Sequence, residues 1–334
     1  MKIQSKIIFI IIFLSLLIRL AIIGFHIKDP NYSIQQDNYI NYTQYLKDKI
    51  VNNSDFPKDT LDTRLFPGYP VVILLLESIY KSFITSGLVI SLISSLLSIY
   101  FFWLLTKNNW AAFFFSLFPP VWVIQSTKIA TEPITVFLLL LAIILYRRNL
   151  FLITGLTIGF ATDIRLISIC LFLAMVIHLY LNNKRKHLLS LTAGFLMIFS
   201  FLFLFNYLIF GISGIFQQFI VYPVHGRATF GVIQIFKDIP RAIDWGQYRI
   251  LASGIFYLIL NFFGFILLYK HRSLSWFHQI SFFWMGLSLL FIFFIGPTPF
   301  LEEFSRFSVP FAPALIIGIS TLFTARNKNL KLKA

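Results

Sequence analysis

Long apolar segments recur along almost the whole chain, and they constrain the fold more than any other feature of the sequence. An α-helix needs ~17–25 apolar residues to cross the hydrocarbon core of a bilayer, and most of the segments reach or approach that length. Runs of this kind predict transmembrane helices, because a helix satisfies its own backbone polar groups in lipid. The expected segments are roughly residues 7–25, 68–83, 84–106, 110–126, 131–146, 150–164, 166–181, 188–210, 249–269, 276–296 and 306–324.

The composition supports an all-α integral membrane protein. The 334 residues are 58% hydrophobic and only 12% charged, whereas ~25% of the residues of a soluble domain are charged. A net charge of +15 also occurs in nucleic-acid-binding proteins, but here the basic residues gather in short loops, as they do on the cytoplasmic side of membrane proteins. We therefore expect membrane lipids and no nucleic acid as partners. The single cysteine, Cys170, excludes an intrachain disulfide.

The basic clusters predict the topology. If the N-terminus and Lys107 are both cytoplasmic, residues 68–106 must cross an odd number of times, so segment 68–83 is either re-entrant or part of its neighbour. We predict one polytopic domain over 1–334 with ten crossings and both termini cytoplasmic, in a plasma or inner membrane. The first segment is expected to be a retained helix, and no soluble C-terminal domain is expected. The clusters are Lys2/Lys6, Lys107, Arg147–Arg148, Lys184–Lys186, Lys270–Arg272 and the tail from Arg326 to Lys333.

This topology places two long loops outside the cytoplasm, at residues 26–69 and 211–248. The first loop contains six of the thirteen acidic residues. Within it, Gln35–Lys49 has helical composition with interspersed tyrosines, which predicts a helix lying in the membrane interface. A further interfacial helix is expected near Gln217–Tyr222.

Acidic residues at the external ends of the segments are candidates for catalysis, since charges at the edge of a bilayer are costly and usually functional. Asp37 can accept a proton from a hydroxyl nucleophile, although most loop aspartates are merely solvated. Glu132 follows Thr131, which is expected to cap the helix. Dipole compensation in the first helical turn explains Glu132 equally well.

Arginines at the same ends are candidates for binding an anion, because a guanidinium matches a phosphate in two hydrogen bonds. Arg64 precedes Pro67-Gly68-Tyr69-Pro70, a segment that also reads as a simple helix start. Arg165 is either functional or an ion-pair partner of Asp163.

Three further features bear on packing and on the class of protein. Arg306 follows Glu303 and precedes Pro310 and Pro313, which should loosen the last helix. Gly155 and Gly159 have the spacing of close helix packing. There is no P-loop, Gly-rich nucleotide fingerprint, H-E-x-x-H or cysteine-based metal motif, which argues against a nucleotide-driven pump. The sequence does not decide whether a divalent metal is needed.

The ordered set of these motifs resembles the polytopic GT-C glycosyltransferases, most nearly the bacterial relatives of protein O-mannosyltransferases and lipid A aminoarabinose transferases. The resemblance runs through most of the chain. Two features depart from the family: Asn38 stands where a tandem acid is often found, and the chain stops just after the last segment. The motifs that carry it are Asp37 in the first external loop, Arg64-x-x-Pro-Gly-Tyr-Pro, Thr131-Glu132-Pro133, Arg165 after a glycine-spaced helix, and Glu303-x-x-Arg306.

The resemblance implies transfer of a sugar from a polyprenyl-phosphate donor to a lipid, glycan or protein acceptor outside the cytoplasm. It implies that Asp37 is the catalytic acid, with Glu132 positioning the sugar or sharing the role. The residues expected to bind lipid phosphate or sugar are Arg64, Tyr69, Arg165, Glu303 and Arg306. The alternatives are a transporter or a lipid or glycan flippase and, with less weight, a non-catalytic assembly subunit.

Overall fold

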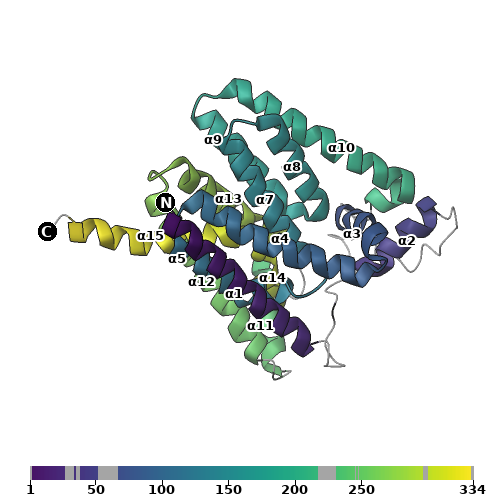
Figure 1. The fold of residues 1–334 in the computed structure, drawn as a ribbon, viewed down its shortest axis with the longest axis horizontal. Coiled ribbons are helices and arrows are strands. Elements are labelled where there is room, and N and C mark those ends of the chain that lie inside the picture. Colours follow the sequence, from purple (N-terminus) through teal and green to yellow (C-terminus); the bar gives the residue numbers. More distant parts are fainter. Residues whose placement is uncertain are drawn as a thin grey trace.

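The computed structural model describes residues 2–26, 34, 38–51, 67–216, 231–244, 246, 248–295 and 300–331. Throughout these residues the regular structure is helical, with no strand (Figure 1). The predicted all-α class is therefore confirmed. The elements are α1 (Lys2–His26), α2 (Tyr39–Val51), α3 (Gly68–Tyr80), α4 (Phe83–Thr106), α5 (Asn109–Leu117), α6 (Pro120–Gln125), α7 (Thr131–Arg147), α8 (Phe151–Ile164), η2 (Leu166–Ser168), α9 (Ile169–Leu181), α10 (Arg185–Phe216), α11 (Gly231–Asp244), α12 (Tyr248–His271), α13 (Trp276–Ile295), α14 (Phe300–Phe307), η5 (Val309–Phe311) and α15 (Ala312–Lys331).

Five stretches of these helices are long and apolar enough to cross a membrane: Lys6–Phe25, Phe83–Thr106, Leu251–His271, Trp276–Phe294 and Glu303–Leu322. Shorter apolar helices cover Gly68–Tyr80, Phe151–Ile164 and Leu166–Leu181. Large apolar side chains also face outward along α1, including Phe9 and Phe13, as expected for a surface against lipid. The chain is a multi-pass membrane protein.

Helices α4 and α7 run parallel, and this orientation defines two ends of the molecule. Near their starts, Ile129 lies against Gly87, and further along, the rings of Phe101 and Phe137 stack at 5.5 Å. Lys107 and Arg147, at their far ends, therefore lie at the same end of the bundle. We call this the basic end.

Other predicted cytoplasmic loops meet at the basic end. The Tyr146 hydroxyl lies 2.7 Å from His178 Nδ1, and the Tyr146 ring stacks on Trp276 at 6.2 Å. These contacts bring the α7–α8, α9–α10 and α12–α13 turns together. Ile7 of α1 shares a pocket with Lys107, so the start of α1 also lies at the basic end.

Helices α2 and α3 pack together at the opposite end. Tyr42, Tyr45 and Leu46 are buried and contact Val71 and Leu74 of α3. The helix predicted at Gln35–Lys49 exists but begins at Tyr39. Its tyrosines face the protein rather than the membrane interface, because their spacing places them on the one apolar face of the helix.

Helix α3 is separate from α4. It ends at Lys81, whose φ of 54° is left-handed, and Ser82 then caps α4 by accepting a hydrogen bond from the Thr85 N–H. The last turn of α3 is held to α2 by an ion pair of 3.0 Å between Lys47 Nζ and Glu77 Oε1. Segment 68–83 is thus neither a continuation of α4 nor a helix of membrane-spanning length.

The segment predicted as one helix at 110–126 is broken into α5 and α6. Pro119 and Pro120 have no N–H, so the carbonyls four residues earlier lose their helical donors. Arg19 of α1 supplies a replacement: Nη1 and Nη2 each lie 3.3 Å from the Ser116 carbonyl oxygen, and Nε donates to Ser126 Oγ at 2.7 Å. The break was missed because the apolar composition continues through it.

Two other sequence predictions are confirmed. The last segment is divided at Pro310 into α14, the short η5 and α15. Helices α8 and α10 approach closely at glycine, since a Cβ on Gly155 would lie 2.1 Å from the Leu191 carbonyl oxygen. In the 211–248 loop, Gln217–Tyr222 lies outside the described residues, and the helix that is described there is α11.

Candidate functional site: a buried carboxylate between two arginines

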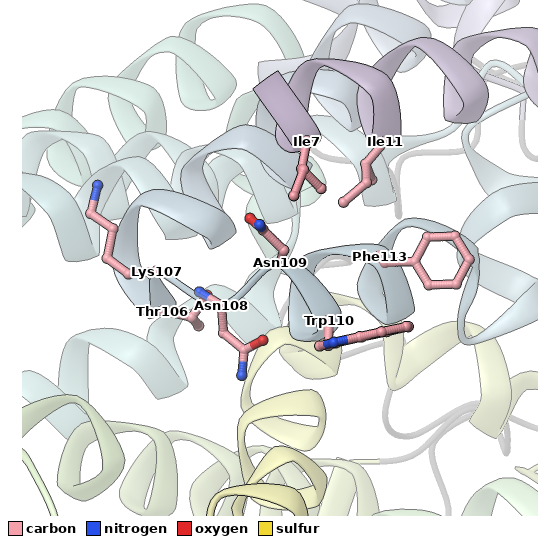
Figure 2. A pocket seen from close by; sticks show the side chains of 8 residues that line it. All are labelled: Ile7, Ile11, Thr106, Lys107, Asn108, Asn109, Trp110 and Phe113. Carbon is pink, nitrogen blue, oxygen red and sulfur yellow. The ribbon is translucent and has the colours of Figure 1, made fainter. Parts of the chain in front are cut away.

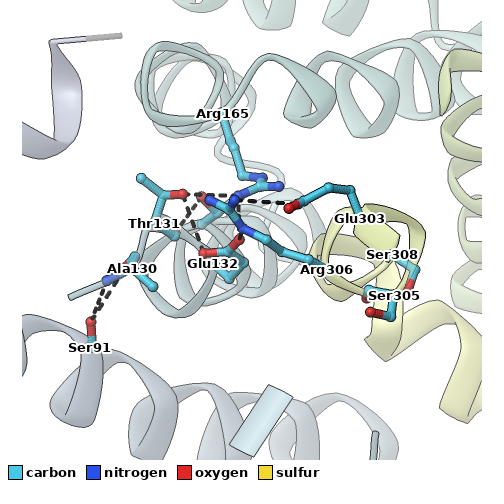
Figure 3. A network of polar contacts seen from close by, with 10 residues as sticks. Ser91, Ala130, Thr131, Glu132, Arg165, Glu303, Ser305, Arg306 and Ser308 are labelled. Atoms are coloured by element: carbon cyan, nitrogen blue, oxygen red, sulfur yellow. Dashed lines mark hydrogen bonds and ion pairs between the residues drawn. The ribbon is translucent and has the colours of Figure 1, made fainter. Parts of the chain in front are cut away.

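Three helices bring Glu132, Arg165 and Arg306 together at the end of the bundle opposite the basic end (Figure 3). Glu132 Oε1 lies 2.5 Å from Arg165 Nη1 and 2.6 Å from Arg306 Nε. The Glu132 side chain is fully buried, whereas those of Arg165 and Arg306 are 10% and 13% exposed. One buried anion therefore holds two arginines that both reach the surface of the cluster.

Local backbone structure explains how each of these side chains is positioned. Ala130 is extended and is bonded to Ser91 of α4, so α7 begins at Thr131 and Glu132 lies in its first turn. Arg165 is extended with φ −151° because α8 ends there and η2 begins. Arg306 occupies the last turn of α14, just before the proline-containing η5.

Arg165 uses only part of its guanidinium for protein contacts. Nη1 donates to Glu132 and to Thr131 Oγ1 at 3.1 Å, and the guanidinium lies 4.9 Å from the centre of the Phe307 ring. Within the described part of the chain, its Nε and Nη2 have no hydrogen-bond partner. Arg165 therefore presents unused N–H groups at a partly exposed position, as an anion site requires.

The described residues of the cluster carry more positive than negative charge. Arg306 Nη1 also contacts Glu303 Oε2 at 3.4 Å. Lys128, in the loop before α7, is close enough to Arg306 to be affected by its charge. Burial and then the positive charge of Arg306 lower the pKa of the Lys128 ammonium. Among the described residues of the cluster, three cationic side chains stand against two carboxylates, and an excess of positive charge favours an anionic ligand.

Two local expectations were wrong. Thr131 does not cap α7: the N-cap residue is Ala130, which makes no side-chain cap, and the Thr131 hydroxyl accepts from Arg165 instead. Arg165 is not the partner of Asp163, because it pairs with Glu132. Asp163 instead lies against Gly68 at the start of α3, since a Cβ on Gly68 would lie 2.8 Å from Asp163 Oδ2.

Tyr69 is placed behind the cluster rather than at its surface. Its side chain is fully buried, and its hydroxyl lies 3.4 Å from both the Gly87 carbonyl oxygen and Ser91 Oγ. Its ring meets that of Tyr39 edge-on at 5.1 Å. Tyr69 therefore joins α2, α3 and α4 beside the loop that precedes Glu132.

Asp37 and Arg64 lie outside the described residues. The described residues that precede and follow Asp37 do contact the elements around the cluster: the Ile34 carbonyl accepts the Ile129 N–H at 2.9 Å, and Tyr39 packs on Tyr69. Of the charged candidates Asp37, Arg64, Glu132, Arg165 and Arg306, the structure brings the last three together.

Two cations that are removed from solvent to different degrees were not predicted. Lys128 was overlooked although it stands in a polar break between apolar segments. Arg19 is fully buried in α1, and a lone arginine in a 20-residue apolar stretch was the available signal.

In the described part of the chain, no group of three or more His, Cys, Asp or Glu side chains is arranged to hold a metal ion.

The fold and the cluster define the protein as an all-α, multi-pass membrane protein with a cationic polar site at one end of its bundle. Comparison with protein-family models and with curated protein sequences finds no match. The function must therefore be argued from the site.

Proposed function

We propose that the protein is a membrane glycosyltransferase that transfers a sugar from a polyprenyl-phosphate donor to an extracytoplasmic lipid, glycan or protein acceptor. The observation that carries the proposal is the Arg165 guanidinium, which is anchored by Glu132 and still has N–H groups without a protein partner. Arg306 lies beside it. Two adjacent guanidinium groups at the end of a helical bundle suit a lipid phosphate whose isoprenoid tail remains in the membrane.

The proposed topology has ten crossings: α1, α4, the broken α5–α6 pair, α7, α8, α9, α10, α12, α13 and α15. Helices α2, α3, α11 and α14 then lie on the extracytoplasmic side. The parallel course of α4 and α7 supports this count, because it leaves α3 at the same end as the Glu132 cluster. The basic end is cytoplasmic by the positive-inside rule, so the cluster is extracytoplasmic, in the cell membrane.

In the proposed reaction an acceptor hydroxyl attacks the anomeric carbon of the donor, and the bond from that carbon to the phosphate oxygen breaks. Asp37 takes the hydroxyl proton. The polyprenyl phosphate leaves with one more negative charge, which Arg165, Arg306 and Arg64 stabilise. Glu132 positions the two arginines, and Glu303 contacts Arg306. Direct displacement inverts the anomeric configuration.

The test of the chemistry is transfer from a synthetic polyprenyl-phosphate sugar to acceptor in membranes. We expect Asp37→Asn to insert normally and to lose transfer by roughly 10²-fold or more, the usual scale for a general base. Asp55→Asn, the same change elsewhere in the same loop, is the control and should keep full transfer. Normal transfer by Asp37→Asn would move the base to Glu132. No sugar transfer by the wild type, with movement of the intact lipid-linked sugar across the bilayer, would instead favour a flippase.

Sidedness can be tested separately from chemistry. Single cysteines at Ser54 and Lys328, in a Cys170→Ser background, should differ in their reaction with a membrane-impermeant thiol reagent. In intact cells only position 54 should be labelled, because it lies in the extracytoplasmic loop of the proposed topology. Labelling of position 328 but not 54 would contradict the topology and the extracytoplasmic site with it.

A further inference from the structure

A second polar site lies at the basic end, far along the helices from the Glu132 cluster. It is an open pocket of about 760 Å³ between the start of α1, the end of α4 and the start of α5. Figure 2 shows Ile7 and Ile11 of α1 facing the α5 residues, with Lys107 at one edge and Phe113 at the other. The lining residues are Ile7, Ile11, Thr106, Lys107, Asn108, Asn109, Trp110 and Phe113.

Both asparagines of this pocket have hydrogen-bond donors left to offer. Asn108 Oδ1 accepts the backbone N–H of Ala111 at 3.2 Å, and Asn109 Oδ1 accepts Trp103 Nε1 at 2.7 Å. Backbone and indole N–H groups can only donate, so each carboxamide must turn its oxygen toward them. The two NH₂ groups have no hydrogen-bond partner in the described part of the chain, and they remain available to a bound molecule.

The electrostatics of the pocket favour a negative charge on that molecule. Lys107 lies at the pocket edge with its ammonium 4.5 Å from the Trp103 ring centre, and Lys6 is exposed one residue before Ile7. The first turn of α5 adds its dipole. The segments that form the pocket contain no acidic residue over 1–28 or 78–131.

The rest of the lining is apolar and reaches the membrane. Trp110 is 81% exposed, and tryptophan prefers the level of the lipid headgroups. Ile7, Ile11 and Phe113 continue the pocket along α1 and α5 toward the hydrocarbon region. The occupant therefore needs an anionic, hydrogen-bond-accepting head and an apolar tail.

We propose that this pocket binds one anionic phospholipid of the cytoplasmic leaflet. The phosphate accepts a hydrogen bond from the Asn109 amide, which points toward Ile7 and Ile11 in Figure 2, and is attracted by Lys107 and Lys6, while an acyl chain packs on Ile11 and Phe113. The site is separate from the Glu132 cluster and does not depend on the function proposed for it.

Native mass spectrometry of the purified full chain tests this proposal, with phosphatidylglycerol as the probe and phosphatidylcholine as the neutral comparison. The double variant Asn108→Asp/Asn109→Asp keeps both acceptor oxygens, and hence both structural hydrogen bonds, but replaces the free donors by negative charge. We expect one tightly retained phosphatidylglycerol on the wild type and roughly tenfold weaker retention on this variant.

Asn149→Asp/Asn183→Asp is the matched control, since it adds the same charge to exposed turns at the same end of the bundle. It should retain phosphatidylglycerol like the wild type. If the aspartate variant is poorly folded, Lys107→Gln provides the test through loss of charge alone. Equal retention by all variants, or equal retention of phosphatidylcholine by the wild type, would overturn the proposal. A wild-type dimer that the aspartate variant dissociates would also overturn it, because a second copy would then occupy the pocket.

Discussion

Two regions of the molecule bury arginine side chains among apolar helices, and they do so in opposite ways. Arg19, fully buried in α1, donates to neutral oxygens: the Ser116 carbonyl, the Ser15 carbonyl and hydroxyl, and the Ser126 hydroxyl. Arg165 and Arg306 instead share the Glu132 carboxylate and remain partly exposed. The Trp122 ring, 5.9 Å from the Arg19 guanidinium, helps to close the first site.

The difference separates an arginine whose donors are all used from one that keeps donors unused, and the proposed binding of a lipid phosphate rests on the second kind. Each of the three guanidinium nitrogens of Arg19 has a partner, and the side chain replaces the donor that Pro120 lacks for the Ser116 carbonyl. Arg165 uses one nitrogen and keeps two without a partner among the described residues. Burial alone therefore does not indicate function; unused donors at an accessible edge do.

The comparison is tested most severely by removing the shared anion. Glu132→Ala should lower the free energy of unfolding by about 3–5 kcal/mol, because it removes the buried anion that two adjacent and largely buried cations share. Thermal unfolding in detergent measures the loss. Glu77→Ala, which breaks the more exposed Lys47 pair, should change stability by less than ~1 kcal/mol. Equal effects of the two changes would show that Glu132 is not needed to hold the arginines.

The next largest effect on stability should come from the site around Arg19. Arg19→Met is close in volume but leaves the Ser116 carbonyl oxygen without its donor, which should lower stability by about 1–3 kcal/mol. Transfer per folded molecule should not change. Arg148→Met, at an exposed helix end, is the control for losing a positive charge. A loss of transfer without a loss of stability would place Arg19 in the functional site, and Arg19 and Arg165 would then no longer differ in role.

The smallest effect on stability should come from Arg165→Lys, which keeps the charge next to Glu132 but loses the planar fork. We expect a change of stability below ~1 kcal/mol and a KM for the lipid-phosphate donor raised by roughly tenfold. Steady-state kinetics in membranes measure it. An unchanged KM together with a large loss of stability would make Arg165 structural, like Arg19.

Much of the architecture follows from local features of the sequence. Apolar runs predict helices, prolines at 310 and 313 predict the divided last segment, and glycines at 155 and 159 predict the close packing of α8. The basic clusters predict one end of the bundle. These features act over a few residues, so they are readable without the fold.

The partners of the charged residues were decided by the tertiary structure. Nothing near Glu132 in the sequence points to Arg306, 174 positions away, and Arg165 has an acid two residues before it that it does not use. Arg19 likewise meets the α5–α6 break only because α1 packs there. Which charge meets which depends on helix packing over tens of residues, and that packing is set by the whole apolar surface rather than by any local pattern.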